Sequence, residues 1–254
     1  MPKTALITGA TSGFGYEFVR LFVQDGYELV LVARNEQRLK QIQAQFPQTS
    51  ITIIPKDLTQ SNAVEEVYEE LKARNIHIDI LINNAGFGLL GYFNQLDLKR
   101  QTDMIQLNVT VLIELTHRLL PAMKEKKYGK ILNVASTAAF QPGPKMTVYF
   151  ATKAFVLSFS EALAEELQGT GISITTLCPG PSKTNFAKAA NVEGTKMFSK
   201  VMDARIVTVE GYRGMMQGKR VIIPGGVNKL GAYAAKFLPR SLVAKVAKWL
   251  TPDQ

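Results

Sequence analysis

Three side chains in the middle of the chain have the types and spacing of a proton-transfer site. Tyr149 and Lys153 are four residues apart, and Ser136 precedes Tyr149 by thirteen. Residues four apart share a helix face, so the Lys153 ammonium is expected to lower the Tyr149 pKa from its usual value of about 10. Tyr149 would then act as general acid or base, while Ser136 holds the substrate oxygen. The set predicts chemistry on a carbonyl or an alcohol.

A glycine-rich turn near the start of the chain has the sequence of a phosphate-binding site. Residues 8–15 read TGATSGFG, after an apolar strand pattern and before a helical one, which is the context that such a motif requires. The free N–H groups and the dipole of a helix N-terminus favour an anion. A purely structural glycine turn is the alternative. We expect the pyrophosphate of a dinucleotide to be held by Gly9, Thr11, Ser12, Gly13, Phe14 and Gly15.

The ends of the next strands indicate which dinucleotide would bind. An acidic residue after the second strand would bind a ribose 2′-hydroxyl, whereas an arginine pairs with a 2′-phosphate. The chain has Arg34 at this point and no acidic residue before Glu36, so we predict NADP(H). The alternative is that Arg34 is an ordinary solvated loop residue, and Asp57 could equally cap a helix. Further contacts to the adenosine half are expected from Asp57, Leu58, Asn84, Ala85 and Gly86.

Strand and helix patterns alternate along the chain and predict how these residues are brought together. Apolar runs predict strands at residues 5–8, 28–33, 51–55, 80–82, 130–134, 173–178 and 220–223. Helical periodicity predicts helices at residues 14–24, 36–46, 63–74, 107–124 and 150–166. Strands joined by single helices form parallel βαβ units. We therefore predict one α/β domain over residues 1–254, with a doubly wound, Rossmann-like parallel sheet of about seven strands and helices on both faces.

Composition excludes several other kinds of protein. The 254 residues are 46% hydrophobic and 20% charged, which is typical of an ordinary globular domain. The single cysteine, Cys178, excludes an internal disulfide and a cysteine-based metal site, and two histidines are too few for a histidine-rich one. We see no targeting signal and no apolar run of the roughly 18 residues that span a membrane. We expect a cytoplasmic protein with no bound metal.

Together these motifs resemble the short-chain dehydrogenase/reductase family, in its compact, NADP(H)-preferring branch whose members are about as long as this chain. The resemblance covers residues 4–185. It rests on the TGxxxGxG turn, on NNAG at residues 83–86, and on the set Ser136, Tyr149 and Lys153. It implies the same doubly wound fold and an oxidoreductase that moves a hydride between a nicotinamide and a carbonyl or secondary alcohol. It also implies a homodimer or homotetramer.

The resemblance assigns a role to further residues. Asn108 matches a fourth catalytic residue, which holds a water that links the lysine to solvent. Pro179, Gly180 and Thr184 match a segment that contacts the nicotinamide, and the ribose is expected to meet Tyr149 and Lys153. Some NADP(H)-preferring members carry a basic residue where this chain has Ser12. The cofactor prediction therefore depends on Arg34.

Mostly apolar loops are expected at the same edge of the sheet. This composition favours a hydrophobic or bulky carbonyl compound over a sugar or a small acid, although several of these side chains could simply fill the core. Residues 181–210 have no clear periodicity and are expected to cover the site as a mobile segment. The predicted substrate contacts are Phe87, Leu89, Phe140 and Phe186.

The positive charge of the chain is concentrated near its C-terminus. Residues 205–254 carry nine basic and two acidic side chains, which is +7 of the net +9. Residues 229–254 form a basic amphipathic tail that Pro239 splits into two short helices. We favour a tail docked on its own domain or on a partner subunit over weak contact with an anionic membrane. Nucleic acid is not expected, because no aromatic platform accompanies the lysines.

A second function remains open from the sequence. A protein could bind NADP(H) without turnover and act as a sensor or scaffold. The complete set of Asn108, Ser136, Tyr149 and Lys153 argues against this, because a pure binder does not need all four side chains.

Overall fold

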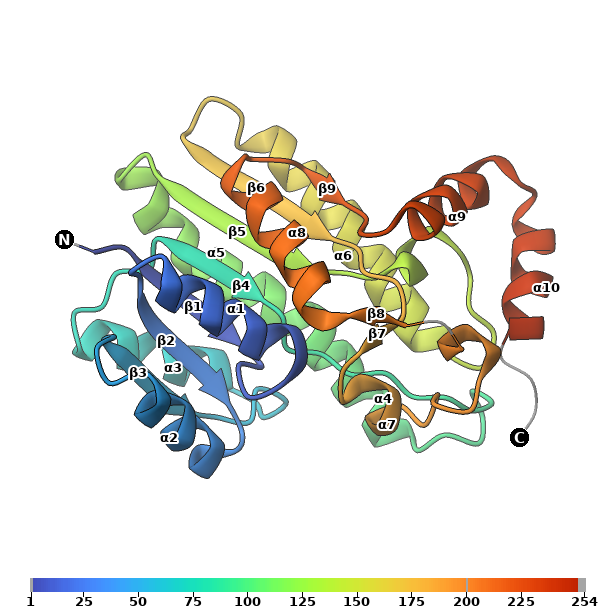
Figure 1. The fold of residues 1–254 in the computed structure, drawn as a ribbon, viewed down its shortest axis with the longest axis horizontal. Coiled ribbons are helices and arrows are strands. Elements are labelled where there is room, and N and C mark those ends of the chain that lie inside the picture. The colour runs from blue at the N-terminus through green and yellow to red at the C-terminus, as the bar shows by residue number, and fades with distance from the viewer. Residues whose placement is uncertain (1, 200, 251–254) are drawn as a thin grey trace.

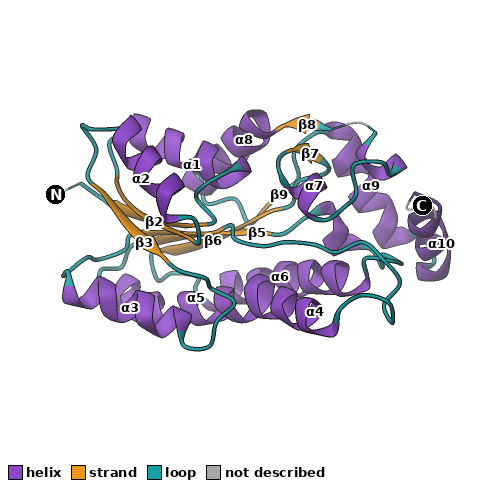
Figure 2. Ribbon diagram, turned by 90° about the horizontal axis from the view of Figure 1, so that it is seen from below, coloured by secondary structure: helices purple, strands orange, loops and turns teal. Residues whose placement is uncertain are grey.

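The computed structural model describes residues 2–199 and 201–250, which form a seven-stranded parallel sheet between two layers of helices (Figure 1, Figure 2). The strand order is β3-β2-β1-β4-β5-β6-β9. This confirms the predicted doubly wound sheet. The chain adds strands on one side of β1 as far as β3 and then on the other side from β4 onward, and in such folds ligands bind where the strand order switches, between β1 and β4. The strands are β1 (Thr4–Thr8), β2 (Glu28–Ala33), β3 (Ile51–Pro55), β4 (Ile80–Asn83), β5 (Gly129–Val134), β6 (Ile172–Leu177) and β9 (Val221–Ile222).

Helices cover both faces of the sheet, as the view along its edge shows (Figure 2). One layer contains α1 (Gly13–Gln24), α2 (Glu36–Gln45) and α8 (Ala204–Met216). The other contains α3 (Ala63–Ala73), α4 (Leu98–Ile105), α5 (Val111–Glu125) and α6 (Thr147–Glu166). Each layer has its own apolar core, with Phe18 and Phe22 on the first side and Val67 and Leu115 on the second. Strands buried on both faces have the continuous apolar sequences seen in β1 and β2.

The helix predicted at residues 107–124 is longer than expected and contains a π-turn. It begins with α4, where the Asp97 side chain accepts a hydrogen bond from the Arg100 backbone N–H (2.7 Å). The π-turn η1 (Gln106–Thr110) then joins α4 to α5. Such turns are frequent at functional sites, and Asn108 is buried within this one. The sequence periodicity misses α4 because most of its side chains are polar.

The C-terminal third contains elements that the sequence predicts only in part. Between β6 and α8 lie β7 (Ser182–Lys183), α7 (Phe186–Ala189), η3 (Lys196–Phe198) and β8 (Met202–Asp203), with β7 paired to β8. The sequence misses α8, although Asp203 caps it. Pro239 separates α9 (Gly226–Phe237) from α10 (Arg240–Leu250), as predicted, and both helices lie beyond the C-terminal ends of the strands (Figure 1).

Residues 251–254 of the predicted tail lie outside the described part of the chain. Within that described part, none of the helices has both the length and the apolar character that crossing a bilayer requires.

Candidate active site

A cavity of about 1200 Å³ opens along the edge of the sheet where the strands end. Residues that follow six strands line it: Gly9, Arg34, Asp57, Asn84, Ser136 and Pro179. The volume exceeds the roughly 300–1,000 Å³ of a typical small-molecule site. The cavity therefore offers room for a dinucleotide and a substrate together.

The glycine-rich turn forms one end of this cavity. Gly9 and Gly13 have φ angles of +65° and +53°, a conformation that glycine adopts without strain. A Cβ on Gly15 would lie 2.2 Å from the Gly9 carbonyl oxygen, so Gly15 serves the close packing of the turn and does not line the cavity. The Ser12 side chain makes no capping hydrogen bond at the start of α1. This glycine cradle and open helix N-terminus fit a pyrophosphate.

Asn84 fixes the glycine-rich turn through its side chain. Its Nδ2 donates to the backbone oxygens of Thr8 (2.9 Å) and Gly9 (3.2 Å). The Thr8 hydroxyl in turn accepts hydrogen bonds from the backbone N–H groups of Asn84 and Ala85, both at 3.0 Å. Asn84, Ala85 and Gly86 also line the cavity, as expected. Thr8 was not among the predicted site residues, although it opens the TGxxxGxG motif.

Thr11, Ser12 and Phe14, predicted to hold the pyrophosphate, line the cavity, and so do Arg34, Asp57 and Leu58, predicted for the adenosine half. Arg34 is exposed and makes no ion pair with any described residue. Lys56, which the sequence reasoning missed, adds a second cation to this wall and pairs with Glu66. One oxygen of the Asp57 carboxylate accepts hydrogen bonds from the Thr59 N–H (3.0 Å) and hydroxyl (2.8 Å), which closes a local turn. Asp57 does not cap a helix, because α3 has Asn62 as its N-cap residue.

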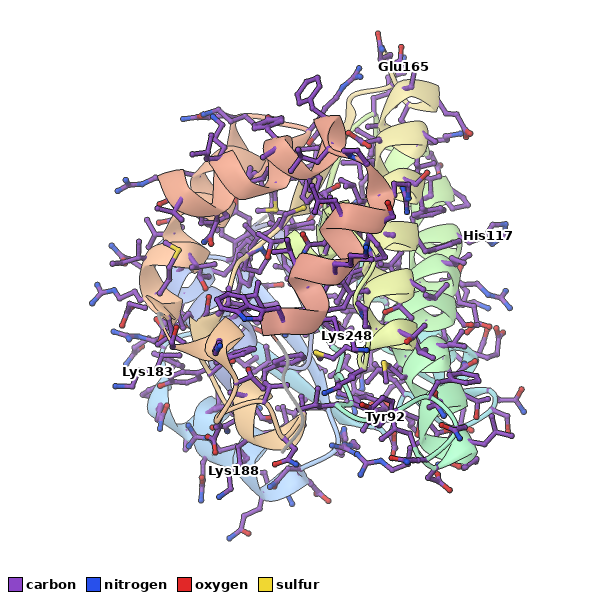
Figure 3. The ribbon with its side chains drawn as sticks, turned by 90° about the vertical axis from the view of Figure 1, so that its right-hand side faces the viewer. Tyr92, His117, Glu165, Lys183, Lys188 and Lys248 are labelled. Carbon is purple, nitrogen blue, oxygen red and sulfur yellow. The ribbon has the colours of Figure 1, made fainter. Side chains whose placement is uncertain are left out.

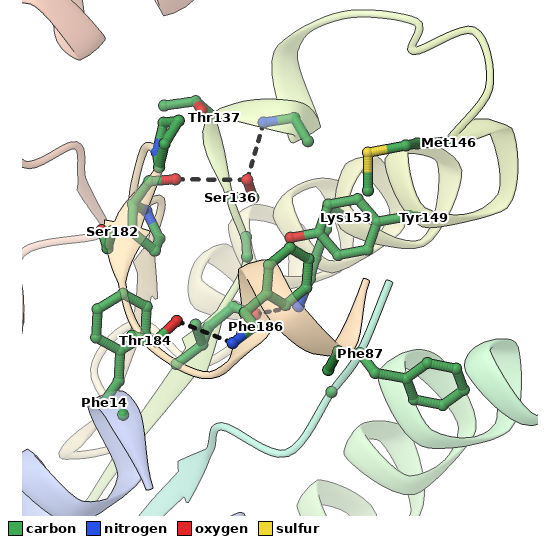
Figure 4. Close-up of a pocket in the computed structure, with 18 of the residues that line it drawn as sticks. Phe14, Phe87, Ser136, Thr137, Met146, Tyr149, Lys153, Ser182, Thr184 and Phe186 are labelled. Atoms are coloured by element: carbon green, nitrogen blue, oxygen red, sulfur yellow. Dashed lines mark hydrogen bonds between the residues drawn. The ribbon is translucent and has the colours of Figure 1, made fainter. Parts of the chain in front are cut away.

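Tyr149 and Lys153 project from one face of α6 into the middle of the cavity (Figure 4). Both are buried. The Lys153 Nζ donates a hydrogen bond to the Val134 backbone oxygen at the end of β5 (2.8 Å) and lies 5.8 Å from the centroid of the Tyr149 ring. The predicted helical pairing therefore brings the phenol and the ammonium to the same wall.

Ser136 reaches the same wall from the loop after β5 (Figure 4). Its hydroxyl donates to the Pro179 backbone oxygen at 3.4 Å and accepts from the Ala138 N–H at 3.1 Å. The donor bond to Pro179 is long, so the hydroxyl is free to turn toward a substrate oxygen. Pro179, Gly180 and Thr184, predicted to contact the nicotinamide, line the neighbouring part of the cavity.

Burial dominates the ionisation of Tyr149 and Lys153. It raises the pKa of Tyr149 to about 12, against an opposing effect of the hydrogen bond with Ser136. It lowers the pKa of Lys153 to about 8, against the opposing influence of the Cys178 thiol. The expectation that Lys153 lowers the Tyr149 pKa does not describe this structure, in which burial raises that pKa and the lowering influence comes from Ser136. The Tyr149 phenol is therefore neutral at pH 7.

Asn108 lies behind this wall and clamps the backbone of Phe87. Its Oδ1 accepts from the Phe87 N–H (3.1 Å), and its Nδ2 donates to the Phe87 oxygen (3.0 Å) and to the Thr152 hydroxyl (3.1 Å). Asn108 does not line the main cavity. It and Lys153 line a small adjoining cavity of about 10 Å³, roughly the volume that a single water centre needs.

Two of the four predicted substrate residues line the cavity, and two do not. Phe87 and Phe186 do so, and the Phe186 ring centroid lies 5.2 Å from that of Tyr149. Leu89 instead packs in an apolar cluster beside the site. Phe140 packs against another cluster, with the Lys236 ammonium 5.4 Å from its ring centroid. Both lie near the predicted place, but their partly buried side chains pack against these clusters and do not line the cavity.

The structure adds lining residues that the sequence reasoning did not identify. Met146 and Phe198 lie near Phe186, and α9 and α10 close the far end of the cavity. No motif marks these residues. Phe198, α9 and α10 are distant in sequence from Tyr149, so their proximity to it arises only when the chain folds.

Residues 3–195 match the model of the short chain dehydrogenase family. The chain therefore belongs to the short-chain dehydrogenase/reductase family of oxidoreductases. It is 38% identical over 187 residues to a serine 3-dehydrogenase of Agrobacterium fabrum, which covers 73% of this chain and 74% of the relative.

Two solved structures are similar over almost the whole chain. A short-chain dehydrogenase from Sphingobium yanoikuyae, in complex with NADPH, has 32% sequence identity and a TM-score of 0.83 over 92% of both chains. The bulky-bulky ketone specific alcohol dehydrogenase from Comamonas testosteroni has 29% identity and a TM-score of 0.78, over 95% of this chain and 96% of that one.

Proposed function

We propose that this protein is an NADP(H)-dependent oxidoreductase that acts on the carbonyl group, or the secondary alcohol, of a neutral hydrophobic substrate. The observation that carries the proposal is the meeting of Ser136, Tyr149 and Lys153 in the cavity that begins at the glycine-rich turn. When bound, the cofactor supplies or accepts the hydride at the substrate carbon. The glycine-rich turn, Arg34 and residues 179–184 would hold it.

The protein's own residues handle the substrate oxygen and its proton. Tyr149, neutral because burial raises its pKa, donates the proton during carbonyl reduction. Ser136 donates a hydrogen bond that orients the oxygen. The Lys153 ammonium stabilises the phenolate that proton donation leaves behind. The small cavity between Asn108 and Lys153 supports a water through which the proton is replaced.

Cofactor preference is tested by replacing Arg34 with aspartate. The substitution removes a cation and sets a carboxylate against the 2′-phosphate, so we expect the Kd for NADPH to rise about 10- to 100-fold. The Kd for NADH should change little, because NADH has a hydroxyl at that position. Fluorescence titration measures both constants.

Arg38→Asp is the matched control for this substitution. Arg38 lies one turn along α2, donates to Gln41 and does not line the cavity. The Arg38→Asp substitution should leave the Kd for NADPH and the Kd for NADH almost unchanged. Equal weakening of NADPH and NADH binding by Arg34→Asp would remove the argument for the 2′-phosphate.

Apolar side chains beside the catalytic tyrosine support a neutral substrate. Met146, Phe150 and Phe186 line the cavity next to Tyr149. The Agrobacterium relative is named for serine, which carries two charges at neutral pH. Absorbance of NADPH at 340 nm, with a panel of ketones and with L-serine in the oxidative direction, tests the proposal. We expect turnover of hydrophobic ketones, whereas a clear preference for L-serine would contradict it.

We also propose that the protein is a cytoplasmic homodimer or homotetramer. Phe155 on α6 is exposed and stacks on Phe159 with 5.8 Å between ring centroids, which supports an apolar contact with another subunit.

A weak peripheral membrane contact is the alternative for the basic C-terminal tail, residues 229–254. It is supported by exposed Leu230 and Phe237 among the lysines of α9. Light scattering and liposome flotation distinguish these partners.

A further inference from the structure

The far end of the cavity is built by the two C-terminal helices. Figure 3 shows α9 and α10 crossing this end of the molecule, with Lys248 on α10. Apart from Asn228, which donates to the Pro224 oxygen at 2.9 Å, the lining residues of α9, α10 and their connection are apolar or glycine. The larger ones are Val227, Leu238, Leu242, Val243, Val246 and Leu250.

One side of α10 is anchored, and another is open to the cavity. Val243 and Ala247 are buried against the rest of the chain. Leu242 and Val246, one helical turn apart, line the cavity and remain 47% and 51% exposed. Apolar side chains left open in a concave site favour a ligand that removes them from water. The open stripe of α10 is therefore a surface for hydrocarbon.

A contact to the segment between β6 and α8 holds α10 over the cavity. The Lys196 ammonium lies 4.0 Å from the centroid of the Trp249 ring, a close cation–π contact. Lys196 also lines the cavity. The ammonium keeps its charge in this contact, so it is the apolar lining from α9, α10 and their connection that favours hydrocarbon at this end of the cavity.

We propose that α10 is the outer wall of the substrate site and binds an extended, neutral hydrocarbon part of the substrate, such as an alkyl chain. The carbonyl of that substrate lies at Tyr149, and Leu242 and Val246 set the preference for chain length. This inference rests on the proposed carbonyl chemistry, but it assigns the substrate class to residues outside the catalytic set.

A series of methyl ketones from 2-butanone to 2-decanone, reduced with NADPH, tests the proposal. In the unchanged protein kcat/KM should rise with chain length, because each added methylene enters an apolar site. In Leu242→Ala/Val246→Ala, kcat/KM for 2-decanone should fall at least about tenfold, while that for 2-butanone stays the same. Leu230→Ala is the matched control, because Leu230 is 72% exposed on α9 and does not line the cavity.

The outcomes separate this inference from the proposed function. If ketones are reduced but the double variant affects all chain lengths equally, or no more than Leu230→Ala does, the inference is overturned and the oxidoreductase proposal stands. If no ketone is reduced, the proposed function fails. The inference that α10 binds an alkyl chain is then decided by whether 2-decanone binds to the protein.

Trp249 provides that binding readout, since it is the single tryptophan of the chain and lies on α10. With NADP⁺ present, 2-decanone should change its fluorescence saturably, 2-butanone should not, and the double variant should lose the response. Absence of any response to 2-decanone in the unchanged protein would overturn the inference.

Discussion

Replacing Tyr149 with phenylalanine is expected to lower kcat for ketone reduction by about 10²- to 10⁴-fold, the usual contribution of a positioned general acid. The Kd for NADPH should be nearly unchanged. The ring is buried and packs 5.2 Å from that of Phe186, so phenylalanine keeps the packing and removes only the proton donor. Absorbance at 340 nm measures kcat, and fluorescence titration measures the Kd.

Tyr212→Phe controls for the loss of a buried phenol. Tyr212 is also buried and donates a hydrogen bond to Asp25, but it does not line the cavity. Its substitution should change thermal stability and leave kcat unaltered. If Tyr149→Phe abolished turnover and NADPH binding together, Tyr149 would be a cofactor-binding residue and not the proton donor.

The second large effect is expected from Lys153→Met. This substitution keeps the volume of the side chain but removes the ammonium, so kcat/KM for NADPH should fall by about 10²- to 10³-fold.

Burial lowers the pKa of Lys153 to about 8, so the ammonium is present below that pH and lost above it. In the unchanged protein kcat/KM for NADPH should therefore decline as the pH rises through about 8. The variant should lack this decline.

Lys130→Met is the matched control for the lysine. Lys130 lies at the other end of β5, donates to the Met216 oxygen at 3.2 Å, and its pKa is also lowered by burial. It does not line the cavity, so this variant should keep both the activity and the decline above pH 8. If the decline persisted in Lys153→Met, another group would be responsible for it.

The sequence predicts those parts of the site whose residues lie within a few positions of one another in the chain. The glycine-rich turn requires Gly9 and Gly13 at positive φ, and few other residues tolerate that conformation. The spacing of Tyr149 and Lys153 places both on one helix face whatever surrounds them. Local geometry of this kind survives folding, which is why these residues meet in the cavity as expected.

The parts that the sequence does not predict depend on distant segments. The pKa of Tyr149 rises because the folded chain excludes water from it, and no local spacing encodes that burial. Phe140 follows the fifth strand as expected, yet its ring packs toward the interior with Lys236 above it. The pattern of the tail predicts two helices at Pro239 but not that Leu242 and Val246 line the cavity.

The π-turn at Asn108 has the same explanation. Its sequence, QLNVT, continues an ordinary helical pattern and contains no residue that predicts a turn with i→i+5 hydrogen bonds. The clamp between Asn108 and the Phe87 backbone forms only when α5 packs beside the loop after β4. Resemblance to a family identified Asn108 as a site residue, whereas periodicity alone would have assigned it to a plain helix.

The most direct test of the central claim is the transfer of deuterium from NADPH labelled at C4 of the nicotinamide to a ketone. We expect the label to appear on the carbinol carbon of the alcohol product, and we expect Tyr149→Phe to bind the labelled cofactor but to transfer almost none of the label. Tight binding of NADPH by the unchanged protein with no label in any product would contradict the account and favour a protein that binds the cofactor without turnover.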